Sequence, residues 1–157
     1  MGLTYLTRRV RFSAAHRYYR PDWDERRNRE VFGACANPVG HGHNYTLDVT
    51  IAGSVADETG FAADLFALDR HLQSVVGPLD HQHLNHVIDD FAEGRAIPSS
   101  ENLVRWLWPR VAGGLEGGVR LHRLRLSEDR DFWVDYYGGA AEPGGRRAAE
   151  SGGSDGA

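Results

Sequence analysis

The stretch of residues 41–51, HGHNYTLDVTI, alternates strictly between two kinds of side chain. Its odd positions carry His41, His43 and Tyr45 and then three aliphatic residues, whereas its even positions after the glycine are all polar. Side chains of a β-strand point to the same face at every second residue. The pattern therefore predicts a strand with one face that begins with two histidines and continues into an apolar core.

A second strand is predicted at residues 4–16, where Val10, Phe12 and Ala14 form an apolar face that ends in His16. The arginine-rich segment that follows, up to Gly33, contains Pro21 and is expected to be a loop.

Two helices and a hairpin are expected in the rest of the chain. Residues 61–75 carry apolar residues at spacings of three and four, which is typical of an amphipathic helix on a sheet. A second helix is expected to begin at Ser99 or Ser100, with Glu101 in its first turn, and to be kinked or shortened by Pro109. Residues 119–127 and 131–137 predict a terminal hairpin. The order is β-β-α-α-β-β, an α+β fold.

Residues 1–137 are thus expected to form one domain, and residues 138–157 a disordered tail. This tail consists of glycine, alanine, serine, proline and charged residues, so it has too little apolar surface to offset the entropy of ordering.

Composition narrows the class of protein. The formal charge is −4 and the isoelectric point is about 6.0, which argues against a nucleic-acid-binding protein. We find no apolar run long enough for a signal peptide or a membrane helix, and a single cysteine excludes an internal disulfide bond. We therefore expect a cytoplasmic protein that has a free thiol at Cys35 and no membrane partner.

The histidines predict a metal site. Side chains two residues apart on a strand lie about 6.5 to 7 Å apart on one face, so His41 and His43 can converge on one ion. A catalytic zinc commonly has three protein ligands and one open position, and His16, at the end of the neighbouring strand, is our candidate for the third. The alternative is that these are ordinary half-buried histidines, but burying such a pair without a partner is costly.

Cys35 lies shortly before His41, and a turn containing Pro38 and Gly40 can fold its thiol over the metal. It is a candidate base or nucleophile, because a nearby cation lowers the pKa of a thiol, although an inert buried cysteine or a fourth ligand is also consistent with the sequence. Asp80 and His81 form a second candidate pair, since a carboxylate can orient an imidazole for proton transfer.

Five segments in this order, FSAAHR, CANPVGHGHNY, LDHQHLN, PSSENL and LSED, resemble the superfamily of 6-pyruvoyltetrahydropterin and 6-carboxytetrahydropterin synthases over roughly residues 8–137. The resemblance implies the tunnelling fold, an antiparallel four-stranded sheet with two helices on one face. It also implies that subunits join edge to edge into an oligomeric barrel, a hexamer of two stacked trimers.

The resemblance also implies roles for individual residues. Zn²⁺ would bind to His16, His41 and His43, and Cys35 would transfer protons with the help of Asp80 and His81. Glu128 would anchor the pterin, because a carboxylate can accept hydrogen bonds from both the ring N–H and the exocyclic amine. Ser99, Ser100 and Glu101 match the start of a helix that helps to bind the pterin, although helix capping explains them equally well.

Five residues separate Cys35 from His41, which resembles the pyruvoyl-forming branch, whereas the carboxy-forming branch of the queuosine pathway typically has three. We therefore expect a zinc-dependent lyase that acts on 7,8-dihydroneopterin triphosphate, with Mg²⁺ accompanying the triphosphate. The alternatives are a 6-carboxytetrahydropterin synthase that releases acetaldehyde, a zinc hydrolase and a non-catalytic zinc module. Two residues depart from the family pattern, Asp129 in place of threonine and Phe61 in place of methionine.

Overall fold

The structure is a computed structural model that describes residues 2–139 of the 157-residue chain. The predicted tail lies outside the described residues from residue 140 onward. Among the described residues, no helix has both the length and the apolar character that crossing a membrane requires.

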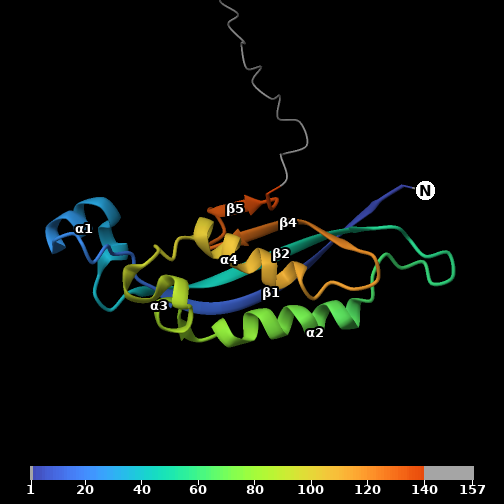
Figure 1. Ribbon diagram of the computed structural model, residues 1–157, viewed down its shortest axis with the longest axis horizontal. Helices are drawn as coiled ribbons and strands as arrows, with labels where there is room; N and C mark the ends of the chain where they lie inside the picture. Colours follow the sequence, from blue (N-terminus) through green and yellow to red (C-terminus); the bar gives the residue numbers. More distant parts are fainter. Residues whose placement is uncertain (1, 140–157) are drawn as a thin grey trace, which may run out of the picture.

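Two long antiparallel strands form the centre of the fold (Figure 1). They are β1 (Thr4–His16) and β2 (His41–Gly53), and both lie where the alternating pattern predicted them. Their register places His16 directly opposite His41 and Ala14 opposite His43. The three histidines therefore meet at one end of the sheet because β1 ends where β2 begins.

Within residues 2–139 the sheet has five strands instead of the expected four, in the order β3-β1-β2-β4-β5. Strands β4 (Arg120–Ser127) and β5 (Trp133–Tyr136) form the predicted hairpin. The additional strand, β3 (Gln82–His83), pairs in parallel with Ala14 and Ala15 of β1. A two-residue strand is too short to produce an alternating pattern, so the sequence did not reveal it.

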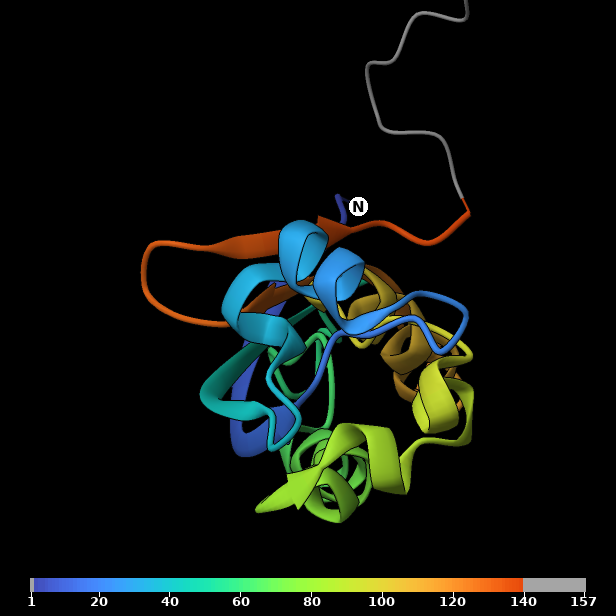
Figure 2. The same ribbon diagram turned by 90° about the vertical axis from the view of Figure 1, so that its left-hand side faces the viewer.

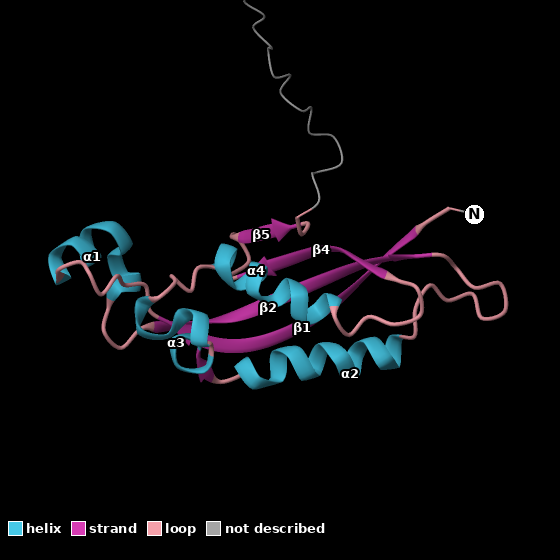
Figure 3. Ribbon diagram, in the orientation of Figure 1, coloured by secondary structure: helices cyan, strands magenta, loops and turns pink. Residues whose placement is uncertain are grey.

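Two long helices run alongside the strands (Figure 3). Helix α2 (Leu65–Val76) begins later than expected, because Asp64 is its N-cap, and Phe61 lies outside it with 67% of its surface exposed. Helix α4 (Ser100–Ala112) has Ser99 as its N-cap and continues through Pro109 to Ala112.

The main core lies between these two helices and one face of the sheet. It consists of apolar side chains that the periodic patterns largely predicted, with Leu79, Leu84, Ile88 and Phe91 added from the segment between the helices. The remaining core side chains from the strands and long helices are Val10, Phe12, Ala14, Tyr45, Leu47, Val49, Ile51, Leu68, Leu72, Val76, Leu103, Val104, Leu107, Val111, Leu124 and Leu126.

The arginine-rich segment is not simply the expected loop, because it contains helix α1 (Glu25–Phe32). Asp24 caps this helix by accepting a hydrogen bond from the backbone N–H of Arg27. Two ion pairs join residues that are four positions apart on the helix. Its one buried residue is Asn28. Without an apolar stripe, α1 could not be recognised by periodicity.

Helix α1 and the short elements lie near the end of the sheet that carries the histidines, and Figure 2 views the molecule from that end. These short elements are the 3₁₀ helices Gly33–Ala36, Gly77–Leu79 and Asp89–Gly94 and the single-turn helix α3 (Leu84–Val87).

Candidate active site

The three histidines predicted to bind a metal lie together. Nε2 of His16 is 3.2 Å from Nε2 of His41, and the ring of His43 is centred 4.8 Å from that of His41 and 5.0 Å from that of His16. One ligand atom from each histidine and one from Glu128 all lie within 4.8 Å of one another. Four side chains from β1, β2 and the end of β4 therefore form one potential metal site.

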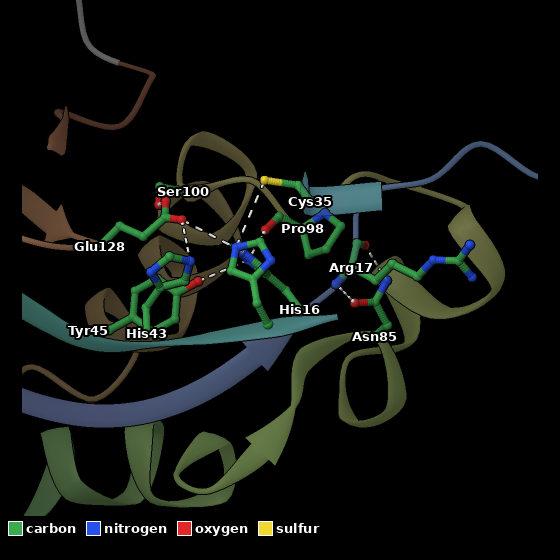
Figure 4. Close-up of polar contacts among 10 residues, drawn as sticks. His16, Arg17, Cys35, His43, Tyr45, Asn85, Pro98, Ser100 and Glu128 are labelled. Carbon is green, nitrogen blue, oxygen red and sulfur yellow. Dashed lines mark hydrogen bonds and ion pairs between the residues drawn. The ribbon is translucent and has the colours of Figure 1, made fainter. Parts of the chain in front are cut away.

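His16 is fully buried, and its second ring nitrogen, Nδ1, contacts two polar groups (Figure 4). Nδ1 lies 3.1 Å from the carbonyl oxygen of Pro98 and 3.0 Å from the hydroxyl of Tyr45. Burial, followed by the neighbouring His41 and His43, lowers the pKa of His16 to about 3. The ring is therefore neutral, and a proton on Nδ1 leaves the lone pair of Nε2 free for a metal.

Glu128 was assigned a role only by family resemblance, and the structure brings it into contact with the histidines. Its Oε1 lies 2.8 Å from Nε2 of His43 and 3.7 Å from Nε2 of His16, and its Oε2 accepts a 2.7 Å hydrogen bond from the hydroxyl of Ser100. Although the contact with His43 is short, its geometry is not that of a hydrogen bond, so the buried Nε2 of His43 has no hydrogen-bonding partner among the described residues.

These residues fit a bound metal ion. Two imidazole nitrogens face each other at 3.2 Å, a third is buried without a hydrogen bond, and a carboxylate oxygen lies beside them. Imidazole and carboxylate are the ligands of many zinc sites. His16, His41, His43 and Glu128 are therefore the residues that would hold the ion.

Cys35 lies beside this cluster, on the 3₁₀ helix Gly33–Ala36 (Figure 4). Its Sγ is 3.9 Å from Nε2 of His41, but it is not one of the four clustered ligands. Partial burial, and secondarily the charge of Glu128, raise the pKa of the thiol. The thiol is close enough to exchange a proton with a molecule bound at the cluster.

The three candidate residues at the start of helix α4 lie in different environments. Ser99 accepts a hydrogen bond from the backbone N–H of Asn102 and so acts as the N-cap, whereas the buried Ser100 contacts Glu128. Glu101 is exposed on the first turn. Only Ser100 among them is joined to the cluster by a hydrogen bond.

Asp80 and His81 form the expected pair, with Nδ1 of His81 2.9 Å from Oδ2 of Asp80. The pair lies on the edge of β1, where the backbone N–H groups of Ser13 and His81 donate to Asp80 Oδ1 and to the Ser13 carbonyl, respectively. The side chain of His81 is 80% exposed, and its φ of 58° is a left-handed conformation that non-glycine residues rarely adopt. Within the described part of one chain, no hydrogen bond or ion pair links this pair to Cys35 or to the cluster.

Two members of the site were missed by sequence reasoning. Tyr45 was placed on the correct face of its strand, but only as part of the apolar pattern, although its position two residues after His43 was a signal. The carbonyl of Pro98 could not be foreseen, because any backbone carbonyl can accept such a bond. Close to Asp80 and His81 in the chain, His83 is half-buried and stacks on His86.

The arginines near Cys35 in the chain differ in their partners. Arg20, Arg26 and Arg29 pair with carboxylates, whereas Arg17 and Arg27 stack on the rings of Tyr19 and Trp23. Arg17, Arg20 and Arg29 contribute to the walls of a hollow of about 270 Å³. Its wall also includes Ala36, the neighbour of Cys35.

Comparison with known proteins shows similarity to pterin synthases along most of the chain. Residues 5–139 match the family model described as 6-pyruvoyl tetrahydropterin synthase. The chain is 34% identical to the 6-pyruvoyl tetrahydrobiopterin synthase of Homo sapiens over 134 residues, which is 85% of this chain and 90% of that protein. It is also 36% identical over 95 residues to a putative 6-carboxy-5,6,7,8-tetrahydropterin synthase of Archaeoglobus fulgidus, covering 60% of this chain and 73% of that protein.

The fold is shared with a solved structure. The 6-pyruvoyl tetrahydropterin synthase of Caenorhabditis elegans superposes with a TM-score of 0.80 at 28% identity, covering 88% of this chain and 97% of that chain.

Proposed function

Because the chain belongs to the 6-pyruvoyl tetrahydropterin synthase family, whose members are lyases, we propose that it converts 7,8-dihydroneopterin triphosphate into 6-pyruvoyl-5,6,7,8-tetrahydropterin and triphosphate. The observation that carries this proposal is the thiol of Cys35 standing 3.9 Å from a histidine of the cluster without being one of the clustered ligands. A lyase that moves protons on a substrate side chain needs such a group next to its metal, not bound to it.

His16, His41 and His43 hold Zn²⁺ in this proposal, and His16 is oriented by its contacts with the Pro98 carbonyl and the Tyr45 hydroxyl. When bound, zinc supplies Lewis-acid chemistry, which makes the carbons that bear the side-chain hydroxyls more acidic. Cys35 then carries protons between these carbons, so the internal redox change needs no redox cofactor, and triphosphate leaves.

Glu128 anchors the pterin in this proposal, because its two carboxylate oxygens can accept the parallel donors of the aminopyrimidinone edge. Ser100 is in hydrogen-bonding contact with that carboxylate, and Ser99 and Glu101 complete the start of the helix. The triphosphate, with Mg²⁺, would approach from the side of Arg17, which has no carboxylate within ion-pair distance among the described residues.

A closed homo-oligomer, expected to be a hexamer, is also part of the proposal. Among the described residues, strand β3 pairs with β1 only at Ala14 and Ala15, so the rest of this edge is open to a strand of another copy. Asp80 and His81 lie on the same edge, and no hydrogen bond or ion pair among the described residues joins them to Cys35 of their own chain. We therefore assign them to the site of a neighbouring copy, where they would exchange protons with its Cys35.

The second candidate is the carboxy-forming reaction, which the Archaeoglobus relative favours by its name. The five residues between Cys35 and His41 favour the pyruvoyl product. A zinc hydrolase would leave Cys35 without a task, and a closed site of Cys35 with the three histidines would require the thiol to be among the clustered ligands.

The experiment that tests the proposal is mass spectrometry of the products formed from 7,8-dihydroneopterin triphosphate by the zinc-loaded protein. We expect a tetrahydropterin that keeps the three-carbon side chain, together with triphosphate. Acetaldehyde and 6-carboxytetrahydropterin would instead assign the second reaction. An unchanged pterin skeleton with only free phosphate would indicate a hydrolase.

A further inference from the structure

The carboxylate of Glu128 faces two ways. Oε1 points into the histidine cluster, 2.8 Å from Nε2 of His43, whereas Oε2 accepts the hydrogen bond of Ser100 (Figure 4). The side chain is only 12% exposed, so these contacts replace water around a charged group. In this arrangement Oε1 is one of the four potential metal ligands.

This arrangement conflicts with simultaneous binding of a pterin. The aminopyrimidinone edge and the carbon that bears the side chain lie at opposite ends of the two fused rings. A pterin whose edge bonds to a carboxylate at the metal position would therefore hold its own side chain away from the histidines. Both carboxylate oxygens are also needed for the edge, whereas Oε1 here belongs to the cluster. Glu128 can thus serve the metal or the pterin, but not both from one position.

The surroundings of Glu128 allow its side chain to exchange between these partners. It follows the last residue of β4, and its backbone N–H donates to the carbonyl of Phe132 across the hairpin. Asp129 fixes the turn separately by accepting from the N–H groups of Asp131 and Phe132. Because these hydrogen bonds hold the backbone, the exchange would move the carboxylate by rotation about its side-chain bonds.

We propose that Glu128 is an exchangeable fourth metal ligand, which completes the site with His16, His41 and His43 until a pterin binds. The carboxylate then leaves the metal and accepts the two hydrogen bonds of the pterin edge, which opens one coordination position for the substrate side chain. No electrons are transferred, since one coordination bond is exchanged for two hydrogen bonds. This inference rests on the proposed pterin substrate. It links substrate binding to the change from a closed site, with Glu128 as fourth ligand, to an open site with one free coordination position.

Cobalt(II) tests the exchange, because its visible absorption reports the number and type of its ligands. The variants are Glu128→Gln and, as a matched control, Asp129→Asn, which makes the same change from carboxylate to amide at the next residue. We expect Glu128→Gln to change the cobalt spectrum and to weaken cobalt binding about tenfold or more, with no change in Asp129→Asn. Addition of 7,8-dihydroneopterin, which lacks the triphosphate leaving group, should shift the wild-type spectrum in the direction of fewer carboxylate ligands.

Identical cobalt spectra and affinities in wild type and Glu128→Gln would overturn the inference. So would a wild-type spectrum that does not change when pterin fluorescence shows saturation. If Glu128→Gln does not fold, Glu128→Asp withdraws the carboxylate by one methylene and should show the same weakening. Product analysis remains separate: failure to form any pterin product would disprove the proposed function, whereas a normal product with an unchanged cobalt spectrum would reject only the exchange.

Discussion

The hydroxyl oxygen of Tyr45 lies 3.0 Å from Nδ1 of His16, and both residues are buried on the face of the sheet that forms the core. Tyr45 follows His43 by two residues on β2, so the strand that supplies two potential ligands also supports the third. Such contacts orient a metal-binding imidazole and fix which of its nitrogens carries the proton. We therefore expect Tyr45 to act as a positioning residue for the potential metal site.

The variant Tyr45→Phe should weaken zinc binding about 10- to 100-fold while leaving the fold intact. It removes only the hydroxyl, and the stacking of this ring on Phe12, with centroids 5.0 Å apart, remains possible. Competition with a chromophoric chelator measures the affinity, and circular dichroism checks the fold.

Tyr18→Phe is the matched control for this prediction. The ring of Tyr18 also contacts His16, with centroids 4.7 Å apart, but its hydroxyl is not bonded to Nδ1. Zinc affinity should stay within about twofold of wild type. Equal weakening in both variants would show that loss of any nearby hydroxyl matters and would remove the special role of Tyr45.

The sequence predicted the fold best where periodicity is strong. The bounds of β1 and the first residue of β2 were correct because alternation in each segment is set by one buried face. The sequence did not predict α1 or β3. Helix α1 is stabilised by capping and ion pairs, and β3 by the pairing of two residues with the edge of β1. These contacts depend on tertiary neighbours, and they leave little periodic trace in the sequence.

The same distinction applies to the site. His41 and His43 could be paired from spacing alone, and His16 from its place at the end of a strand. Glu128 could not, because its significance depends on the approach of the β4–β5 turn to the start of α4. Without the family resemblance it would have been taken for a solvent-exposed residue of a hairpin.

Replacement of His43 should remove the metal. His43→Ala deletes one of the clustered imidazoles, so we expect the purified protein to contain far less than one zinc per chain. His86→Ala is the control, because His86 stacks on His83 outside the cluster and should leave zinc content unchanged. Metal analysis by mass spectrometry gives the answer, and near-complete zinc occupancy in His43→Ala would contradict the assignment.

The stability of the metal-stripped protein should depend on pH through His16. Its pKa in the folded chain is lowered to about 3, so between pH 6.5 and 3 the unfolded chain binds a proton at this position and the folded chain does not. The free energy of unfolding should therefore fall as the pH falls below 6.5, by up to about 1.4 kcal/mol per pH unit from this group.

Urea unfolding in the presence of a chelator at pH 7.5, 6.5 and 5.5 measures this dependence. The variant His16→Asn lacks the titrating ring and should show a smaller loss between pH 6.5 and 5.5. Parallel losses in wild type and His16→Asn would mean that His16 titrates normally in the folded protein.

Cys35→Ala should separate proton transfer from metal binding. Because Sγ is not among the clustered ligands, the variant should keep one zinc per chain. Removal of a positioned acid–base group typically costs about 10²- to 10⁴-fold in turnover. Product formation and zinc content are measured on the same sample. Loss of zinc would make Cys35 a ligand, and full activity would favour a hydrolase.

Two inactive variants should restore activity when they are assembled together. Asp80 and His81 bond to the edge of β1 and not to Cys35 of their own chain, so each site should combine Cys35 of one copy with His81 of another. Co-expression of Cys35→Ala with His81→Ala should yield about one quarter of wild-type activity, since each residue is intact in half of the copies of a randomly mixed oligomer.

The control mixture is Cys35→Ala with His43→Ala. These two residues belong to one site within one chain, where Sγ of Cys35 lies 3.9 Å from His41 beside the cluster that includes His43. Every site in this mixture lacks one of the two groups, so activity should not return. Mixed oligomers can be verified with two affinity tags. If doubly tagged oligomers of Cys35→Ala and His81→Ala stay inactive, while each variant alone folds and binds zinc, His81 does not act on the thiol of a neighbouring copy.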